Sequence, residues 1–125
     1  KKLQALSIDG IFPVPIHRER RKKRGYNQAE VIGEALAKEC DIPIFSAYLT
    51  RDKKTKALKE LSPMERMQSL LSAMACENLP KEVKKVLLVD DIFTTGATME
   101  ACARKLLEKG AEEVYILAIA ARAER

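Results

Sequence analysis

Three segments of the chain have the apolar pattern of buried strands: residues 11–15, 83–89 and 114–121. The second contains the uninterrupted apolar run Val86–Val89, which is typical of a strand covered on both faces. The pattern after it predicts a helix over about 98–109, ended by Gly110 in a left-handed conformation. A strand, a helix and a strand in this order predict a right-handed βαβ crossover. We therefore expect an α/β fold with a parallel sheet.

The first half of the chain carries two helix-like patterns. Asn27 can cap a helix over about 28–39, with Glu30 as a capping-box-like partner. The apolar side of this helix is formed by Ile32, Ala35, Leu36 and Cys40. The stretch Ser62-Pro63-Met64-Glu65 has a capping serine, an early proline and a glutamate three residues on, which predicts a second helix start. Its buried stripe is formed by Met67, Leu70, Leu71 and Met74.

Two segments between these elements carry weaker patterns. Residues 42–49 are predicted as a further strand, and the polar residues 51–60 as a surface segment. The first strand should end near Val14, because Pro13 and Pro15 lack the backbone donor that a strand ladder needs.

Length and composition are those of one globular domain spanning residues 1–125. No apolar run approaches the ~20 residues of a membrane helix, so we expect no membrane insertion. The first residue is lysine, so we expect a fragment or an N-terminally trimmed chain. The three cysteines form no CxxC pair, and we interpret them as buried reduced thiols of a cytoplasmic protein: Cys40, Cys76 and Cys102.

The net charge of +5 is concentrated in one short segment. Residues 17–24, HRERRKKR, hold six basic side chains and one acid, so this segment alone carries +5 and the remaining residues sum to zero. Such a run can clamp pyrophosphate, bind nucleic acid or remain a solvated surface. Tyr26 is the only aromatic ring next to it, whereas single-strand sites use several. This ring can stack on a base or pack against the helix start.

Residues 86–98, VLLVDDIFTTGAT, combine an apolar strand with the features of a phosphate site. In a parallel sheet, ligands bind beyond the carboxyl ends of strands, and the start of the following helix favours an anion. Gly96 permits a tight turn that exposes backbone amides. The hydroxyl donors around it are Thr94, Thr95 and Thr98. The stretch therefore predicts a phosphate cradle.

The two acids in this stretch need a different explanation, because carboxylates repel phosphate. Asp90 and Asp91 can accept hydrogen bonds from two vicinal hydroxyls, or hold Mg²⁺ through water. A diol next to a phosphate describes a sugar phosphate such as ribose 5-phosphate. The alternative is a capped helix start with solvated acids.

The same thirteen residues resemble the phosphoribosyl pyrophosphate (PRPP) signature of type I phosphoribosyltransferases. Two further stretches resemble the ComF family, competence-associated proteins of this type. PVPIHRERRKKRGYNQAEVIGEALAKE is similar to the family's PVPLH…RGFNQ region, and LTRDKKTKALKELSPMERMQSLLSAM is similar to its LxRxRxTxxQxxLxxxERxxN segment. The resemblance covers nearly all of the chain from Ile11 onward. It implies a type I phosphoribosyltransferase fold, a mainly parallel sheet with helices on both faces.

The resemblance also implies a role for each matching position. Asp90 and Asp91 would bind the ribose hydroxyls of PRPP, and its 5-phosphate would be held by Thr94, Thr95, Gly96, Ala97 and Thr98. The loop after the first strand would face the pyrophosphate, with the candidates Pro15, Ile16, His17 and Arg18. A flexible loop over 51–61 would close over the site, with the candidates Arg51, Lys53, Lys54 and Thr55. Mg²⁺ would enter with PRPP, without direct protein ligands. His17 remains either a pyrophosphate contact or proton shuttle, or an exposed loop residue.

The implied activity is Mg²⁺-dependent transfer of a phosphoribosyl group to an unidentified acceptor, with release of pyrophosphate. No catalytic residue is identified. The alternative is a non-catalytic accessory or regulator of DNA uptake that keeps the PRPP site as a sensor and contacts single-stranded DNA or competence-machinery proteins. Departures from the ComF pattern lie in the loop and its flank, at Ala57, Leu58 and Gln68, and the family's N-terminal cysteine cluster, expected to bind zinc, is absent. Relatives often dimerise, so a homodimer is one expected assembly.

Overall fold

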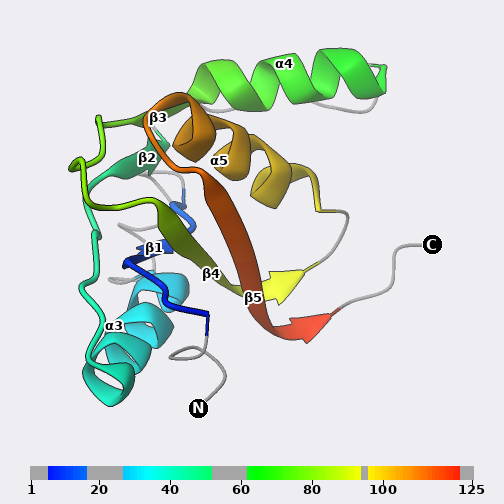
Figure 1. Cartoon of the computed structure of the whole chain (residues 1–125). Coiled ribbons are helices and arrows are strands. Elements are labelled where there is room, and N and C mark those ends of the chain that lie inside the picture. The colour runs from blue at the N-terminus through cyan, green and yellow to red at the C-terminus, as the bar shows by residue number, and fades with distance from the viewer. Residues whose placement is uncertain (1–5, 17–26, 52–61, 94–95, 122–125) are drawn as a thin grey trace.

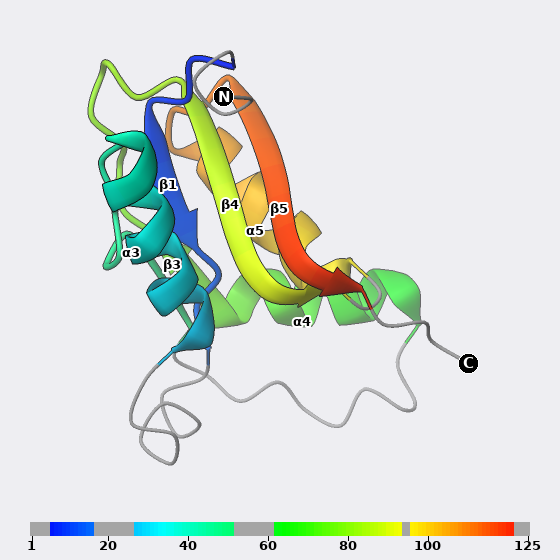
Figure 2. The same cartoon turned by 90° about the horizontal axis from the view of Figure 1, so that it is seen from below.

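The computed structural model describes residues 6–16, 27–51, 62–93 and 96–121, and every structural statement below refers to these residues. A three-stranded sheet forms their centre, with β4 (Lys85–Phe93) between β1 (Gly10–Pro13) and β5 (Glu113–Ala121). Both pairings are parallel, and Figure 2 shows the three strands side by side. The predicted parallel sheet of an α/β fold is confirmed.

Helices cover both faces of this sheet, as predicted. α3 (Gln28–Cys40) packs against β1 and β4 on one face. α5 (Ala97–Glu108) packs on the opposite face, and α4 (Pro63–Ala73) lies against the outer side of α5 (Figure 1). A short antiparallel ribbon completes the described fold, formed by β2 (Leu49–Arg51) and β3 (Met74–Cys76).

The central strand is buried from both sides. Val86 to Val89 are at most 2% exposed. Leu87 and Val89 join the cluster beneath α3, whereas Val86 and Leu88 join the cluster beneath α5. Because successive side chains point to opposite faces, a strand in this position needs an apolar residue at every step. This explains the uninterrupted run in the sequence.

Two of the predicted helix starts are confirmed, and the second of them has the complete capping box. Ser62 Oγ accepts a hydrogen bond from Glu65 N at 3.1 Å, and Ser62 N donates to Glu65 Oε1 at 2.8 Å, which completes the capping box of α4. At α3, Asn27 Oδ1 accepts from Ala29 N at 3.0 Å. The buried Asn27 also donates from Nδ2 to Val14 O at 3.0 Å, so one side chain fixes the start of the helix and the end of β1.

The predicted end of α5 is confirmed as well. Gly110 follows the last helical turn with φ +128°, a conformation that favours glycine. Ala111 N donates to Leu106 O at 3.0 Å, the bond that closes a Schellman-type helix end. β5 begins soon after, so β4, α5 and β5 form the predicted unit of two parallel strands joined by a helix.

The predicted strand over 42–49 is wrong. Ile44 makes a single parallel bridge to Ile11, in which Pro43 O accepts from Ile11 N and Phe45 N donates to Ile11 O. Pro43 has no donor of its own, so the ladder stops there. An aromatic cluster then holds the segment: the Phe45 ring stacks on Phe12 with centroids 5.0 Å apart, and Tyr48 contacts both rings edge-on.

The predicted apolar side of α3 needs one change. Ile32, Leu36 and Cys40 pack against the cluster beneath α3, but Ala35 is exposed. Ala29 and Gly33 are buried instead. In α4, Leu70 is buried, and Met67 and Leu71 pack partly buried against the same core, as predicted. Met74, the fourth residue of the predicted stripe, is buried in the same core but lies at the start of β3, because the helix ends at Ala73.

Among the described helices, none combines the length and the apolar character that crossing a membrane requires.

We predict that Asn27→Ala lowers the free energy of unfolding by about 2 kcal/mol, because the substitution removes the helix cap and leaves the Val14 carbonyl without its donor. Asn27→Asp keeps an acceptor for Ala29 N but has no donor for Val14 O. It therefore isolates the second contact. Urea denaturation at neutral pH measures both variants. If Asn27→Asp is as stable as the wild type, the Val14 contact contributes nothing.

Candidate functional site

The two acids lie where the sheet narrows from three strands to two. β1 ends at Pro13, opposite Val89, and Val14 N donates to Val89 O at 2.8 Å. β4 continues beside β5 alone, with Asp90 opposite Ala118 and a last pair at Phe93. The expectation that the strand stops before the acids is therefore wrong. The ladder to β5 carries the strand past Val89, and the acids lie within it.

Each of the two carboxylates is oriented by a backbone amide. Asp90 Oδ1 accepts from Asp91 N at 2.8 Å, and Asp91 Oδ1 accepts from Ile92 N at 2.9 Å. Both side chains are partly buried. Since each carboxylate has a second oxygen, the pair can still accept hydrogen bonds from two neighbouring hydroxyls.

Asp90 is unusual in its protonation. Burial raises the pKa of Asp90 to about 7, and a hydrogen bond between its side chain and that of Asp91 and the negative charge of Asp91 act in the same direction. The hydrogen bond from Asp91 N acts in the opposite direction. Near neutral pH, Asp90 therefore exchanges between a carboxyl that can donate a hydrogen bond and a carboxylate that can only accept one.

The start of α5 differs from those of the other described helices. Its N-cap is Gly96, with φ +83° and ψ −5°, a residue that has no side chain with which to cap the helix. α3 and α4, by contrast, are capped by their own asparagine and serine. Ala97 and Thr98 lie half-buried in the first turn of α5. α5 follows the strand that carries the acids, and the start of a helix has the partial positive charge that favours an anion.

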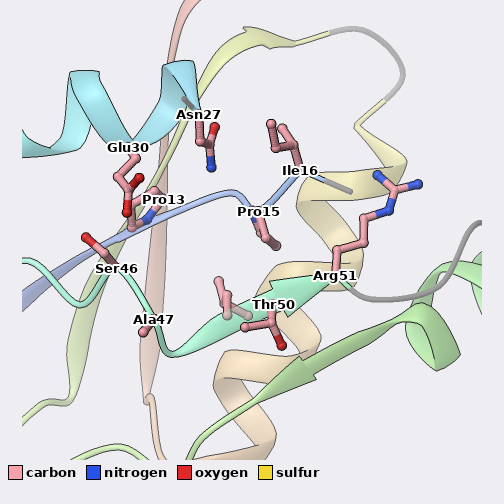
Figure 3. Close-up of a pocket in the computed structure, with 10 residues that line it drawn as sticks. Pro13, Pro15, Ile16, Asn27, Glu30, Ser46, Ala47, Thr50 and Arg51 are labelled. Carbon is pink, nitrogen blue, oxygen red and sulfur yellow. The ribbon is translucent and has the colours of Figure 1, made fainter. Parts of the chain in front are cut away.

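A pocket of about 330 Å³ lies beyond the end of β1. Figure 3 shows around it Pro15 and Ile16 from the segment after β1, the helix cap Asn27, Glu30 from α3, and Arg51 from β2. Sequence reasoning placed Asn27 only at a helix cap and gave Glu30 no part in a site. No sequence signal points to their meeting here, because the fold alone brings α3 over the end of β1.

Arg51 and Asp90 act on the same buried thiol. Burial raises the pKa of Cys102 to about 12, the negative charge of Asp90 adds to this effect, and the positive charge of Arg51 opposes it. Both charges are therefore within electrostatic reach of Cys102, although they come from β2 and β4. Of the predicted site residues, the structure brings Pro15, Ile16 and Arg51 to one pocket. It places Asp90 and Asp91 on β4, directly after the residue opposite the end of β1.

The remaining predicted site residues lie outside the described residues: His17, Arg18, Lys53, Lys54, Thr55, Thr94 and Thr95. The basic run 17–24 and Tyr26 do as well.

Within the described part, no group of three or more histidine, cysteine or acidic side chains could hold a metal ion. The three thiols are free; Cys76 and Cys102 are buried as predicted, whereas Cys40 is only partly buried.

We predict that Asp90→Asn stabilises the fold at neutral and higher pH but has little effect near pH 4. The folded pKa of about 7 lies above the ordinary value of 3.8, so the folded state favours the neutral carboxyl. Its contribution to stability is complete below the ordinary pKa and is lost as the pH rises through about 7. An amide cannot ionise and escapes this loss. Urea denaturation from pH 4 to 8 measures the difference.

Asp9 is the matched control, because its pKa is shifted in the opposite direction. Hydrogen bonds from Lys85 N and then Lys84 N lower the pKa of Asp9, so its contribution is present at neutral pH and lost on acidification. Asp9→Asn should destabilise the fold at neutral pH and lose its effect in acid. If the change in the free energy of unfolding depends on pH in the same way for both variants, the environment described for Asp90 is contradicted.

Comparisons with known proteins agree with this geometry. Residues 27–125 match the model of the phosphoribosyl transferase domain family. The chain is 34% identical over 114 residues to competence protein F of Haemophilus influenzae, which covers 90% of this chain and 50% of that protein. It is 36% identical over 102 residues to competence protein ComFC of Bacillus subtilis, covering 80% and 39%. It is also 32% identical over 108 residues to the DNA utilization protein YhgH of Escherichia coli K12, covering 86% and 47%.

Among solved structures, a purine phosphoribosyltransferase from Pyrococcus horikoshii matches with a TM-score of 0.60 at 20% identity, covering 96% of this chain and 65% of that one. This likeness concerns the fold. The chain spans about half the length of the curated relatives it matches. The chain therefore belongs to the phosphoribosyl transferase domain family, and its predicted resemblance to the ComF proteins is confirmed.

Proposed function

We propose that this chain binds PRPP with Mg²⁺ and belongs to the phosphoribosyl-transferring class. The observation that carries the proposal is the arrangement of β4 and α5: two oriented carboxylates lie near the end of the strand, and a helix whose N-cap is a glycine follows it. A sugar phosphate has matching features, with two vicinal hydroxyls and a phosphate a few bonds away.

Asp90 and Asp91 would accept hydrogen bonds from the two ribose hydroxyls. Their Oδ1 atoms are held by backbone amides, so the carboxylates are positioned before the ligand arrives. The 5-phosphate would lie at the start of α5, near Gly96 and Thr98, with the further predicted contacts at Thr94 and Thr95.

The pyrophosphate group would lie beside the segment after β1, at Pro15 and Ile16. Asn27 holds the preceding carbonyl of Val14 and thereby sets the direction in which this segment leaves the sheet. When bound, Mg²⁺ would neutralise the negative charge of the pyrophosphate. The donor set fits a cation carried by the ligand, because the described acids form a pair that can hold metal-bound water rather than a complete shell of ligands.

The proposed reaction is a substitution at C1 of the sugar. The acceptor's lone pair forms the new bond to C1, the bond from C1 to the pyrophosphate oxygen breaks, and its electron pair leaves with the pyrophosphate. The protein contributes position and electrostatic stabilisation of a cation-like sugar rather than a covalent nucleophile. A cytoplasmic location, with reduced thiols, is part of this proposal.

The competing function is a non-catalytic partner of DNA uptake that uses the same site as a sensor. The names of the relatives favour it, since they are described as competence and DNA utilization proteins. Its surface for single-stranded DNA or for competence proteins would be the basic run 17–24. The two functions make opposite predictions about the fate of PRPP.

We predict that PRPP with Mg²⁺ stabilises the wild type by about 2.7 kcal/mol when its concentration is a hundred times its dissociation constant. This corresponds to a rise of several degrees in melting temperature for a domain of this size. The double variant Asp90→Asn/Asp91→Asn should fold and show no such rise, because the amides lack the negative charge and the second acceptor oxygen with which the carboxylates would bind the ribose hydroxyls. Thermal unfolding with and without ligand measures both proteins.

The matched control is Glu112→Gln/Glu113→Gln, which neutralises two adjacent acids at the opposite end of the neighbouring strand. It should keep the wild-type rise. Ribose 5-phosphate and pyrophosphate, tested separately, divide the site into its two halves. An equal rise in the wild type and in the Asp90/Asp91 variant would overturn the assignment of the ribose to these acids.

We further predict pyrophosphate release when PRPP is incubated with the wild type and a mixture of nucleobases and amines. The Asp90/Asp91 variant is the negative control. A protein that is stabilised by PRPP but leaves it intact with every acceptor has the behaviour of a sensor, and this result would contradict the transferase.

A further inference from the structure

β5 forms an outer edge of the described sheet. The strand runs for nine residues and pairs with β4 on one side only. Figure 2 shows no described strand beyond it on the other side, and α4, which extends past β5 in this view, lies behind the sheet. Among the described strands, none pairs with the backbone groups on that side, and an edge of this kind can pair with another strand.

This edge lacks the devices that usually prevent such pairing. Natural edge strands are protected by charged residues, prolines, bulges or short length. From Val114 to Ala121 the sequence VYILAIAA has no charge, no proline and no glycine. The register to β4 is constant from Lys85–Glu113 to Phe93–Ala121, so no bulge interrupts the strand.

The side chains next to this edge are exposed on both faces of the sheet. Ile116 is 48% exposed and Ile119 is 65% exposed. Because they are three residues apart, they point to opposite faces. A strand added to β5 would contact isoleucine on each face, in addition to the backbone hydrogen bonds.

We propose that β5 pairs with β5 of a second copy of this chain, antiparallel and about a twofold axis. Charge selects this orientation. In a parallel pair, Glu112 and Glu113 would lie beside the same residues of the second copy and repel them. In an antiparallel pair, the acids lie at opposite ends of the interface. In the sequence, Arg122 follows directly after β5. In the antiparallel pair, the acidic start of β5 in one copy therefore lies beside the end of β5 in the other copy, which this basic residue follows.

The pairing has a natural register. With Leu117 on the twofold axis, Tyr115 lies opposite Ile119 of the second copy, an aromatic and β-branched pair of the kind that stabilises antiparallel strands. Such a twofold interface closes on itself and joins two three-stranded sheets into one of six strands. The carboxyl edges of the two sheets then face opposite directions. The two candidate sites open away from each other.

The test is the mass of the protein in solution, measured by light scattering and sedimentation over a wide range of concentration. The wild type should have about 28 kDa, twice the 14.0 kDa of one chain. Ile116→Lys/Ile119→Lys should halve this mass. The matched control is Val31→Lys/Leu107→Lys, which changes two equally apolar residues, 48% and 49% exposed, on α3 and α5. The control should stay dimeric.

Circular dichroism and melting temperature establish that both double variants fold. A monomeric wild type at the highest concentration overturns the proposal. So does an Ile116/Ile119 variant that folds and remains dimeric, or a control that dissociates to the same extent.

A crosslink tests the register independently. Leu117→Cys should form a disulfide with its own copy under mild oxidation, because residues directly opposite have Cβ atoms about 5 Å apart. Leu107→Cys, on α5, and the wild type, with its native thiols, should show no comparable crosslinked dimer. A dimeric Leu117→Cys protein that does not crosslink overturns the twofold register.

Discussion

The burial of Val86–Val89 on both faces of β4 is the constraint on which the rest of the structure depends. Four consecutive residues can be apolar and almost fully buried only if one helix covers each face of the sheet. α3 and α5 meet this requirement from opposite sides, and β1 and β5 flank the strand. The strand can carry polar side chains only where this cover ends. Asp90 is the first residue at which it does.

The site therefore depends on the fact that β4 extends further than its neighbour β1. β1 stops at Pro13 because its prolines cannot extend a ladder, whereas β4 continues to Phe93 against β5. Asp90 thus remains within the fold but next to an uncovered strand edge. Partial burial and a neighbouring acid keep its pKa high, while Asp91 N fixes its position. On the other side, Asn27 fixes the end of β1 by donating a hydrogen bond to Val14 O.

Much of this fold could be predicted from the sequence, because its strongest signals are local. Apolar runs, the capping box at Ser62 and the glycine after α5 each act within a few residues of where they stand. The predicted PRPP signature likewise occupies one continuous stretch. The parallel pairing of β4 and β5 follows from these elements and from the preference for parallel βαβ units, whereas the place of β1 beside β4 was not predicted.

The failures involve contacts between distant segments. Residues 42–49 have strand composition, but the stacking of Phe45 on Phe12 and the proline at 43 hold them as an irregular segment instead. The link from Asn27 to Val14 spans thirteen residues and has no sequence signature. The meeting of Asn27, Glu30 and Arg51 around one pocket arises only once α3 and β2 are placed next to β1.

The three thiols offer an experimental handle. Burial raises the pKa of Cys76 to about 11 and that of Cys102 to about 12, so both remain protonated and shielded near neutral pH. Cys40 is partly exposed at the last residue of α3, whereas Asn27 begins that helix beside the end of β1. A thiol-reactive fluorophore would therefore attach first at Cys40. The label would lie a full helix length from the pocket and could report on the protein without occupying it.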